Sequence, residues 1–320
     1  MRIFQDAWNL QELPSPCVAT VGNFDGIHLG QQRIIEKTVA RAEEMGIDSV
    51  VITFEPHPLD VLRPERPPER ITLRPQKRSL IEALGVDALV VIDFSPEFAA
   101  TSAREFVEAF LCGKLGVREF YVGSRFGFGT NREGNLDLLE EMGASLGFAV
   151  EGIEEVAADG STISSTRIRD AIRQGAVEEA ASMLGRTFAV VGEVIRGEGR
   201  GKKHGWPTIN VEVEHQLMPA EGVYASQVWL PSLNSAFDGV TNIGRRPTFP
   251  GGPDFVVETH LFDFESDIYG EMVELGFVAR LREERRFESV EELILQIGED
   301  ATLAREYLGR QDCSLIVPTL

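Results

Sequence analysis

The sequence predicts two domains of different class, an α/β domain built on a doubly wound parallel sheet and, after it, an antiparallel β-barrel. In the first half, unbroken apolar runs such as residues 89–92 alternate with amphipathic helical stretches, which is typical of strands buried on both faces. From Thr187 onward, short strand-like runs follow one another between turns that contain Gly and Pro. A length of 320 residues also suits two domains better than one.

The elements of the first domain are expected in alternating order. Apolar, β-branched runs predict strands at 17–21, 49–54, 87–94, 119–122 and 148–156. Helices are expected at 34–45, ended by Gly46, and at 102–115, 135–146 and 165–174. The Pro-rich stretch 56–75 breaks this alternation, so it is expected to form an excursion or a small subdomain.

The second domain is expected to consist of strands and one closing helix. The strands are predicted at 188–195, 223–230, 236–242, 255–264 and 272–281, and the helix at 290–308. This organisation places the first domain at 1–184, the second at 185–310 and a loose tail at 311–320.

Charge and cysteine content limit the classes of function. A net charge of −20 argues against a nucleic-acid partner, which usually requires a basic surface. No run approaches the roughly 18 apolar residues of a membrane span, and the first residues lack the apolar core of a secretory signal, so no membrane partner is expected. Three cysteines without metal or redox spacing predict free thiols and a cytoplasmic location. The sequence leaves open whether the chain forms a homo-oligomer.

A glycine-rich turn, residues 22–31, follows the first predicted strand and leads into a helix. Glycines let the backbone approach a phosphate, and free N–H groups at a helix start attract negative charge. The glycine spacing fits neither the P-loop nor the dinucleotide fingerprint. His28 stands where its side chain could donate to an α-phosphate. On spacing alone, a phosphate site and a turn capped by Asp25 explain the pattern equally well.

A second group of polar residues begins a later helix. The hydroxyls of Ser164, Ser165 and Thr166 can cap its first N–H groups, and Arg167 and Arg169 can clamp phosphate oxygens. The alternative is an ordinary capped helix with a basic exposed face. The segment 54–58, Phe-Glu-Pro-His-Pro, follows the second strand, and it is either part of a pocket or a plain Pro-rich loop.

A basic loop stands out in the second half of this acidic chain. Glycines and cations gather between residues 196 and 205, a composition that lets a loop fold over a polyphosphate; a solvated hairpin turn is the alternative. Pro207-Thr208-Ile209-Asn210 follows directly and offers two hard oxygen donors. Glu258 lies on a later strand, where alternation alone favours a solvent-facing carboxylate.

Taken in order, these motifs resemble those of bacterial riboflavin kinase/FAD synthetases. The resemblance rests on Gly-x-Phe-Asp-Gly-x-His-x-Gly at 22–30, Ser-Ser-Thr-x-x-Arg at 164–169 and Pro-Thr-x-Asn at 207–210, and it extends from Val18 to Leu308. It implies a Rossmann-like nucleotidylyltransferase domain followed by a riboflavin kinase barrel. The implied reactions are phosphorylation of riboflavin to FMN and adenylylation of FMN to FAD with release of pyrophosphate, each consuming ATP with Mg²⁺.

The resemblance also implies roles for individual residues. Glu258 is the implied base of the kinase, and Thr208 and Asn210 hold its Mg²⁺. The implied ATP-binding residues of the kinase are Gly197, Arg200, Gly201, Lys202, Lys203 and Gly205. His28 is the implied catalytic residue of the adenylyltransferase. Its ATP-binding residues are Gly22, Asn23, Phe24, Asp25, Gly26, Gly30, Gln31, Ser164, Ser165, Thr166 and Arg169, and its FMN-binding residues are Phe54, His57 and Pro58.

Two departures from the family pattern leave alternatives open. The first signature usually ends in His-x-Gly-His, and here Gln31 replaces the second His; Arg125 occupies a later position where the family has Asn or Asp, and it is a candidate for the missing cation. One alternative is therefore a riboflavin kinase with a silent first domain. The others are a non-catalytic flavin carrier or sensor, and an adenylyltransferase that acts on a different phosphate.

Overall fold

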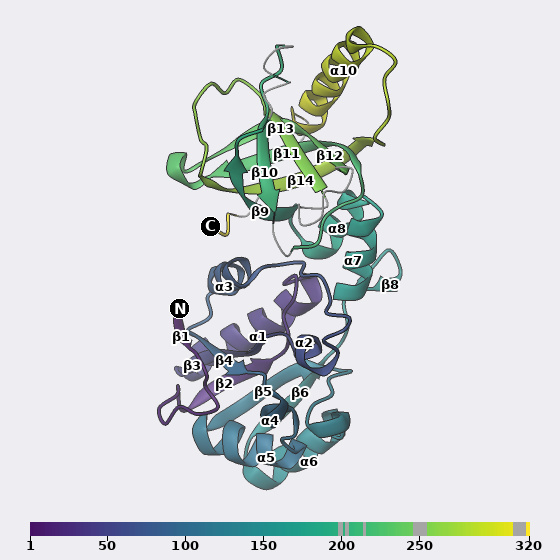
Figure 1. Ribbon diagram of the computed structural model, residues 1–320. Coiled ribbons are helices and arrows are strands. Elements are labelled where there is room, and N and C mark those ends of the chain that lie inside the picture. The colour runs from purple at the N-terminus through teal and green to yellow at the C-terminus, as the bar shows by residue number, and fades with distance from the viewer. Residues whose placement is uncertain (198–200, 202–204, 214–215, 246–254, 310–317) are drawn as a thin grey trace. The chain divides into compact units, whose positions relative to one another are not determined.

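The computed structural model describes residues 1–197, 201, 205–213, 216–245, 255–309 and 318–320 (Figure 1). The chain divides into two compact units. The first comprises Met1–Pro68 and Lys77–Ile163, and the second comprises Glu69–Gln76 and Ser164–Leu320.

The first unit is built on a six-stranded sheet in which every neighbouring pair of strands is parallel. Its strands lie in the order β1 (Arg2–Phe4), β4 (Ala88–Asp93), β3 (Asp48–Glu55), β2 (Cys17–Val21), β5 (Val117–Gly123) and β6 (Ala149–Ile153). The chain proceeds from β2 to one side and later returns to β5 on the other. The crevice beyond the carboxyl ends of β2 and β5 is therefore the topological switch point, where ligands bind in open α/β sheets.

Alternation along the strands buries both faces of this sheet. On β3, Val50 and Ile52 join one apolar cluster and Val51 joins the opposite one. The longer helices are α1 (Leu29–Met45), α3 (Arg74–Ala83), α6 (Leu136–Leu146) and the π-helix Phe106–Lys114, which continues α5 (Ala103–Glu105). The shorter elements are α2 (Pro58–Leu62), α4 (Pro96–Ala99) and the pair β7 (Ala157–Ala158) and β8 (Ser161–Thr162).

The second unit contains a closed antiparallel barrel of six strands. Around the barrel they are β10 (Ile209–Val213), β13 (Phe255–Leu261), β12 (Ser235–Arg245), β11 (Gly222–Leu230), β14 (Met272–Arg282) and β9 (Phe188–Ile195). One face of the strands carries the stacked rings of Phe188 and Phe277 and a buried hydroxyl row in which Thr241 lies 2.8 Å from Thr259. The helices α7 (Ser165–Arg173) and α8 (Val177–Leu184) precede the barrel.

Helix α10 (Val290–Gly309) covers part of the outer face of the barrel (Figure 1). Small and apolar side chains make this packing close: Ala301 and Ala304 on the helix meet Val223 and Val240 on the strands. These strand residues and the hydroxyl row lie on opposite faces of the same strands.

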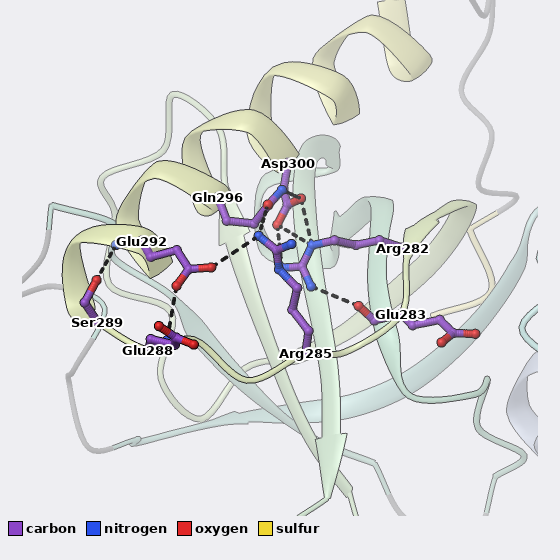
Figure 2. Close-up of polar contacts among 8 residues, drawn as sticks. All are labelled: Arg282, Glu283, Arg285, Glu288, Ser289, Glu292, Gln296 and Asp300. Carbon is purple, nitrogen blue, oxygen red and sulfur yellow. Dashed lines mark hydrogen bonds and ion pairs between the residues drawn. The ribbon is translucent and has the colours of Figure 1, made fainter.

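A buried ion pair fixes α10 to the end of β14 (Figure 2). Arg282 donates from Nε to both oxygens of Asp300, at 3.0 and 3.1 Å, and from a terminal nitrogen at 2.8 Å. Asp300 is only 5% exposed, and it also accepts from Gln296 at 3.0 Å. Because the Asp300 carboxylate is buried, its pairing with Arg282 is needed to offset the cost of desolvating the charge.

The predicted fold class is confirmed, with local differences. The barrel has a strand, β10, that was not among the five expected. The helix expected at 102–115 is mostly π-helical, with an i→i+5 bond of 3.0 Å from Leu115 N to Phe110 O. Part of the Pro-rich stretch forms α2, and residues 69–76 belong to the second unit.

The ends of the expected domains are described only in part. The boundary at 184 stays a prediction; the two compact units separate after Ile163. Residues 311–317 of the expected loose tail lie outside the described residues. Thr319 is buried, and both its backbone N and its hydroxyl donate to the Glu274 carboxylate at 2.8 Å. Within the described ranges, no helix is both long and apolar enough to cross a membrane.

Candidate active sites

The first candidate site begins at the N-terminus of α1, directly after β2. His28 is the N-cap of this helix, and its Nδ1 accepts from the backbone N of Gln31 at 3.3 Å. A ring nitrogen that accepts carries no proton, so the proton of the neutral ring is on Nε2, which is then a donor. The side chain is 8% exposed at the carboxyl edge of the sheet, where the helix dipole favours an anion.

Gln31 completes this cap. Its Oε1 accepts from the backbone N of His28 at 3.1 Å, so the two residues form a reciprocal capping box. A Gln at this position therefore stabilises the start of α1, a role that the sequence analysis did not assign to it.

The turn between β2 and α1 is held in an unusual backbone conformation. Phe24 and Ile27 have φ of +48° and +43°, in the left-handed region that disfavours large side chains, and both are buried. Burial of these two side chains is what holds them there. A Cβ on Gly22 would lie 3.2 Å from the Phe24 ring, so a larger residue at the start of the turn would require this ring to shift slightly. The Asn23 carbonyl accepts weakly from Thr53 at 3.4 Å and Lys77 at 3.5 Å.

The predicted flavin-binding segment follows β3 on the same sheet edge. Phe54 contacts Phe94 edge-on at 5.6 Å and Phe98 at 5.9 Å, so it belongs to an aromatic cluster at the rim of the core. His57 caps α2, accepting from Leu59 N at 3.1 Å, and Pro58 begins that helix. The segment ends the strand next to β2, which places it beside the glycine-rich turn.

Arg125 follows β5, on the other side of the switch point. Its guanidinium forms an ion pair of 2.9 Å with Glu155, and its side chain is 79% exposed. The guanidinium of Arg125, considered above as a substitute for the second His of the signature, is therefore paired with Glu155.

The predicted phosphate-binding helix α7 belongs to the second unit. Ser164 is its N-cap and accepts from Arg167 N at 3.2 Å. Arg167 pairs with Glu179 at 2.9 Å, and Arg169 Nε donates to the carbonyl of Glu69 at 2.9 Å. The predicted residues of α7 therefore lie in the second unit, and His28 lies in the first.

In the barrel, Gly197 and Gly201 lie against the two predicted metal ligands. A Cβ on Gly197 would lie 2.2 Å from the amide nitrogen of Asn210, and one on Gly201 would lie 3.2 Å from Thr208 Oγ1. These glycines therefore allow close approach of the loop to Thr208 and Asn210. Gly205 has φ of +84°, and Arg200, Lys202 and Lys203 lie outside the described residues.

Glu258 stands between two amide side chains. The antiparallel register pairs it with Asn210 on β10 and with Asn242 on β12. Directly opposed residues point to the same face, with Cβ atoms about 4.5–5.5 Å apart. Neighbours on these strands, Val223 and Val240, pack under α10, so Glu258 lies on the outer face of the barrel.

Sequence reasoning missed a cavity and a supporting histidine. A cavity of about 390 Å³ borders Thr208 and is lined by Val194, Pro207, Thr208, Ile209 and residues of the segment 261–269. His260 Nδ1 lies 2.7 Å from the Pro207 carbonyl, and its ring meets the edge of Trp206 at 5.0 Å. His260 therefore holds the turn that carries Thr208. The alternation of β13 places its side chain on the Glu258 face, which was the available signal.

One further carboxyl lies near this face. A Cβ on Gly244 would lie 2.7 Å from Oε1 of Glu284, which follows β14. Glu284 is an exposed residue, but partial desolvation of its carboxyl, and then the nearby carboxylate of Glu221, raise its pKa above the usual value.

Comparison with known proteins supports both halves of the chain. A model of the FAD synthetase family matches residues 10–167, and a riboflavin kinase model matches 184–308. A bifunctional riboflavin kinase/FMN adenylyltransferase of Pseudomonas fluorescens is 38% identical over 95% of this chain and 97% of its own length. Its counterpart in Escherichia coli K12 is 35% identical over 97% and 98%.

The fold as a whole also has a solved counterpart. A Streptococcus pneumoniae crystal structure, described as a macrolide-efflux protein, aligns with a TM-score of 0.86 at 30% identity and covers 95% of this chain and 98% of its own.

Proposed function

This chain belongs to the bifunctional riboflavin kinase/FMN adenylyltransferases and has both activities of FAD biosynthesis, and we propose which of its residues carry them. The single observation that supports the kinase assignment best is the cross-strand row in which Glu258 lies between Asn210 and Asn242 on the outer face of the barrel.

In the proposed kinase site, Glu258 accepts the proton of the riboflavin 5′-hydroxyl as that oxygen attacks the γ-phosphate of ATP, and ADP leaves. Among the described residues, the side chain of Glu258 has no hydrogen bond or ion pair, which leaves its carboxylate available to the acceptor. The cavity beside Thr208 has the size and mixed lining that suit the base and sugar of the nucleotide.

The residues present fit Mg²⁺. Thr208 and Asn210 offer a hydroxyl and an amide oxygen, which are hard donors, and Gly197 and Gly201 lie close to these side chains. Two protein ligands would suffice for this ion, because phosphate oxygens and water would supply the others. The ion, when bound, neutralises charge on the transferred phosphoryl group.

In the proposed adenylyltransferase site, the FMN phosphate attacks the α-phosphate of a second ATP and pyrophosphate leaves. The Nε2–H of His28 and the N-terminal N–H groups of α1 stabilise the charge that develops on the α-phosphate. Phe54, His57 and Pro58 are the flavin-binding residues of this proposal. Ser165, Thr166 and Arg169 are proposed as ATP-binding residues on their sequence motif alone. A cytoplasmic location fits this use of ATP.

The test is a pair of matched variants, Glu258→Gln and Glu193→Gln, the second on an exposed position of β9. With riboflavin, ATP and MgCl₂, chromatography of the products should show FMN formation reduced by roughly 10²–10⁴-fold in Glu258→Gln and unchanged in Glu193→Gln. FAD formation from supplied FMN should stay normal in both. Kinase activity retained by Glu258→Gln would mean that another group is the base.

The metal assignment has its own measurement. In Asn210→Ala, the MgCl₂ concentration that gives half-maximal FMN formation should rise about tenfold, because one oxygen ligand is lost. An unchanged requirement would exclude Asn210 as a ligand.

A further inference from the structure

Glu258 belongs to a row of cross-strand neighbours whose two ends differ. From one strand to the next it runs Asn210, Glu258, Asn242 and Val223, each paired with its neighbour in the antiparallel register. Adjacent strands lie about 4.8 Å apart, so the Cβ atoms of Asn210 and Asn242 are separated by about two strand spacings with Glu258 between them.

The two ends of this row have different surroundings. At the Asn210 end lie Gly197 and Thr208, which form the proposed phosphate side. At the opposite end, Val223 is 4% exposed and packs under α10 with Ala301. The row therefore passes from a phosphate-binding end, across the base, to an apolar end.

The in-line geometry of phosphoryl transfer determines how the acceptor of the phosphoryl group lies along this row. The attacking oxygen must face the γ-phosphate, so the rest of the acceptor extends away from it. With the phosphates at Asn210 and the attacking hydroxyl at Glu258, the hydroxylated chain of the acceptor passes over Asn242.

Asn242 is equipped for such a contact. Its side chain is half-buried, and within the ranges that the structure describes it forms no side-chain hydrogen bond. An amide offers two donors and a carbonyl acceptor, which can pair with a hydroxyl that both donates and accepts. When a half-buried polar group finds its hydrogen-bond partner only on the ligand, a ligand that lacks this partner binds more weakly.

We propose that Asn242 is an acceptor-binding residue of the kinase, which hydrogen-bonds a secondary hydroxyl of the ribityl chain and so selects polyhydroxylated acceptors. This inference rests on the proposed roles of Glu258 and Asn210.

The test compares two acceptors on wild type and Asn242→Leu. One is riboflavin; the other is the 10-(5-hydroxypentyl) analogue, which keeps the terminal hydroxyl and lacks the three secondary ones. In Asn242→Leu, kcat/KM for riboflavin should fall about tenfold, the loss of one hydrogen bond, while kcat/KM for the analogue and KM for ATP stay unchanged. An equal fall for both acceptors, or none for riboflavin, overturns the proposal.

Unchanged kcat/KM for the analogue shows that the barrel of Asn242→Leu is folded. FAD formation from supplied FMN by the same preparations is the control for enzyme concentration.

The outcomes separate this inference from the proposed function. If Glu258→Gln retains kinase activity, the assigned base is wrong. If Glu258→Gln is inactive and Asn242→Leu keeps its preference for riboflavin, the base stands and the acceptor-binding role of Asn242 fails.

Discussion

The two proposed phosphate sites of this chain are built in opposite ways. The α1 site uses backbone: a turn with two buried, positive-φ residues and a helix N-terminus capped by His28 and Gln31. The barrel site uses side chains, presented by neighbouring strands in a fixed register. A backbone site depends on local conformation, whereas a side-chain site depends on whatever holds the strands and their covering helix in place. Substitutions should therefore affect the two activities differently.

The largest effect is expected from removing the anchor of α10. Asp300→Ala removes the buried carboxylate to which Arg282 donates three hydrogen bonds, so the free energy of unfolding of the second unit should fall by about 3 kcal/mol. Urea denaturation followed by circular dichroism measures the loss. Asp263→Ala, which removes an exposed ion pair with Arg305, is the control and should cost under about 1 kcal/mol. Equal losses would show that the Arg282 pair is no stronger than a surface pair.

A methyl group at Gly197 should be the next most damaging change. Its Cβ would meet the Asn210 amide at 2.2 Å, so Gly197→Ala should lower the rate of FMN formation by about 10–100-fold through displacement of the proposed metal ligand. The matched control is Gly309→Ala, because nothing lies within 4 Å of a Cβ there. If both variants phosphorylate riboflavin normally, the loop does not need close approach to Asn210.

Substitutions at Gln31 separate capping from phosphate binding in the α1 site. Gln31→Ala should cost the first unit about 1 kcal/mol, whereas Gln31→Glu should keep the capping box and the stability. The new charge in Gln31→Glu should instead raise KM for ATP in FAD formation. Thermal melts and initial rates of both variants measure these effects. If Gln31→Ala melts like wild type, the reciprocal bonds contribute nothing.

The smallest effect concerns pH. The pKa of Glu284 is higher in the folded chain than in the unfolded chain. The contribution of this carboxyl to the free energy of unfolding is therefore fully present below its unfolded pKa, and it is lost as the pH rises through its folded pKa. Glu284→Gln should therefore raise the melting temperature by about 1–2 °C near pH 8 and have no effect near pH 4. Glu283→Gln, at the neighbouring exposed position, is the control. A stabilisation that is the same at both pH values would contradict this account.

Sequence patterns predicted the features that depend on local chemistry. The glycine-rich turn, the helix after it and the apolar strands on both sides were readable because each is specified within a short segment. Strand β10 was missed although Ile209, Val211 and Val213 alternate with polar residues, because the preceding loop and the metal motif dominated that region.

Long-range features could not be read in the same way. The pairing of Asn242 with Glu258 is set by the register of β12 on β13, and no signal in either segment fixes that register alone. The cavity beside Thr208 is lined partly by a polar loop after β13, whose composition is that of any surface loop. The capping role of Gln31 was overlooked because His is an uncommon N-cap.

The capping box also has a consequence for temperature. The first turn of a helix opens at a lower free energy than the core that it leads into, and here the bonds between His28 and Gln31 oppose that opening. When the turn frays, His28 loses the hydrogen bond that keeps its proton on Nε2. Heating should therefore weaken ATP capture for FAD synthesis before either unit unfolds, while the barrel, closed on all its edges, continues to make FMN.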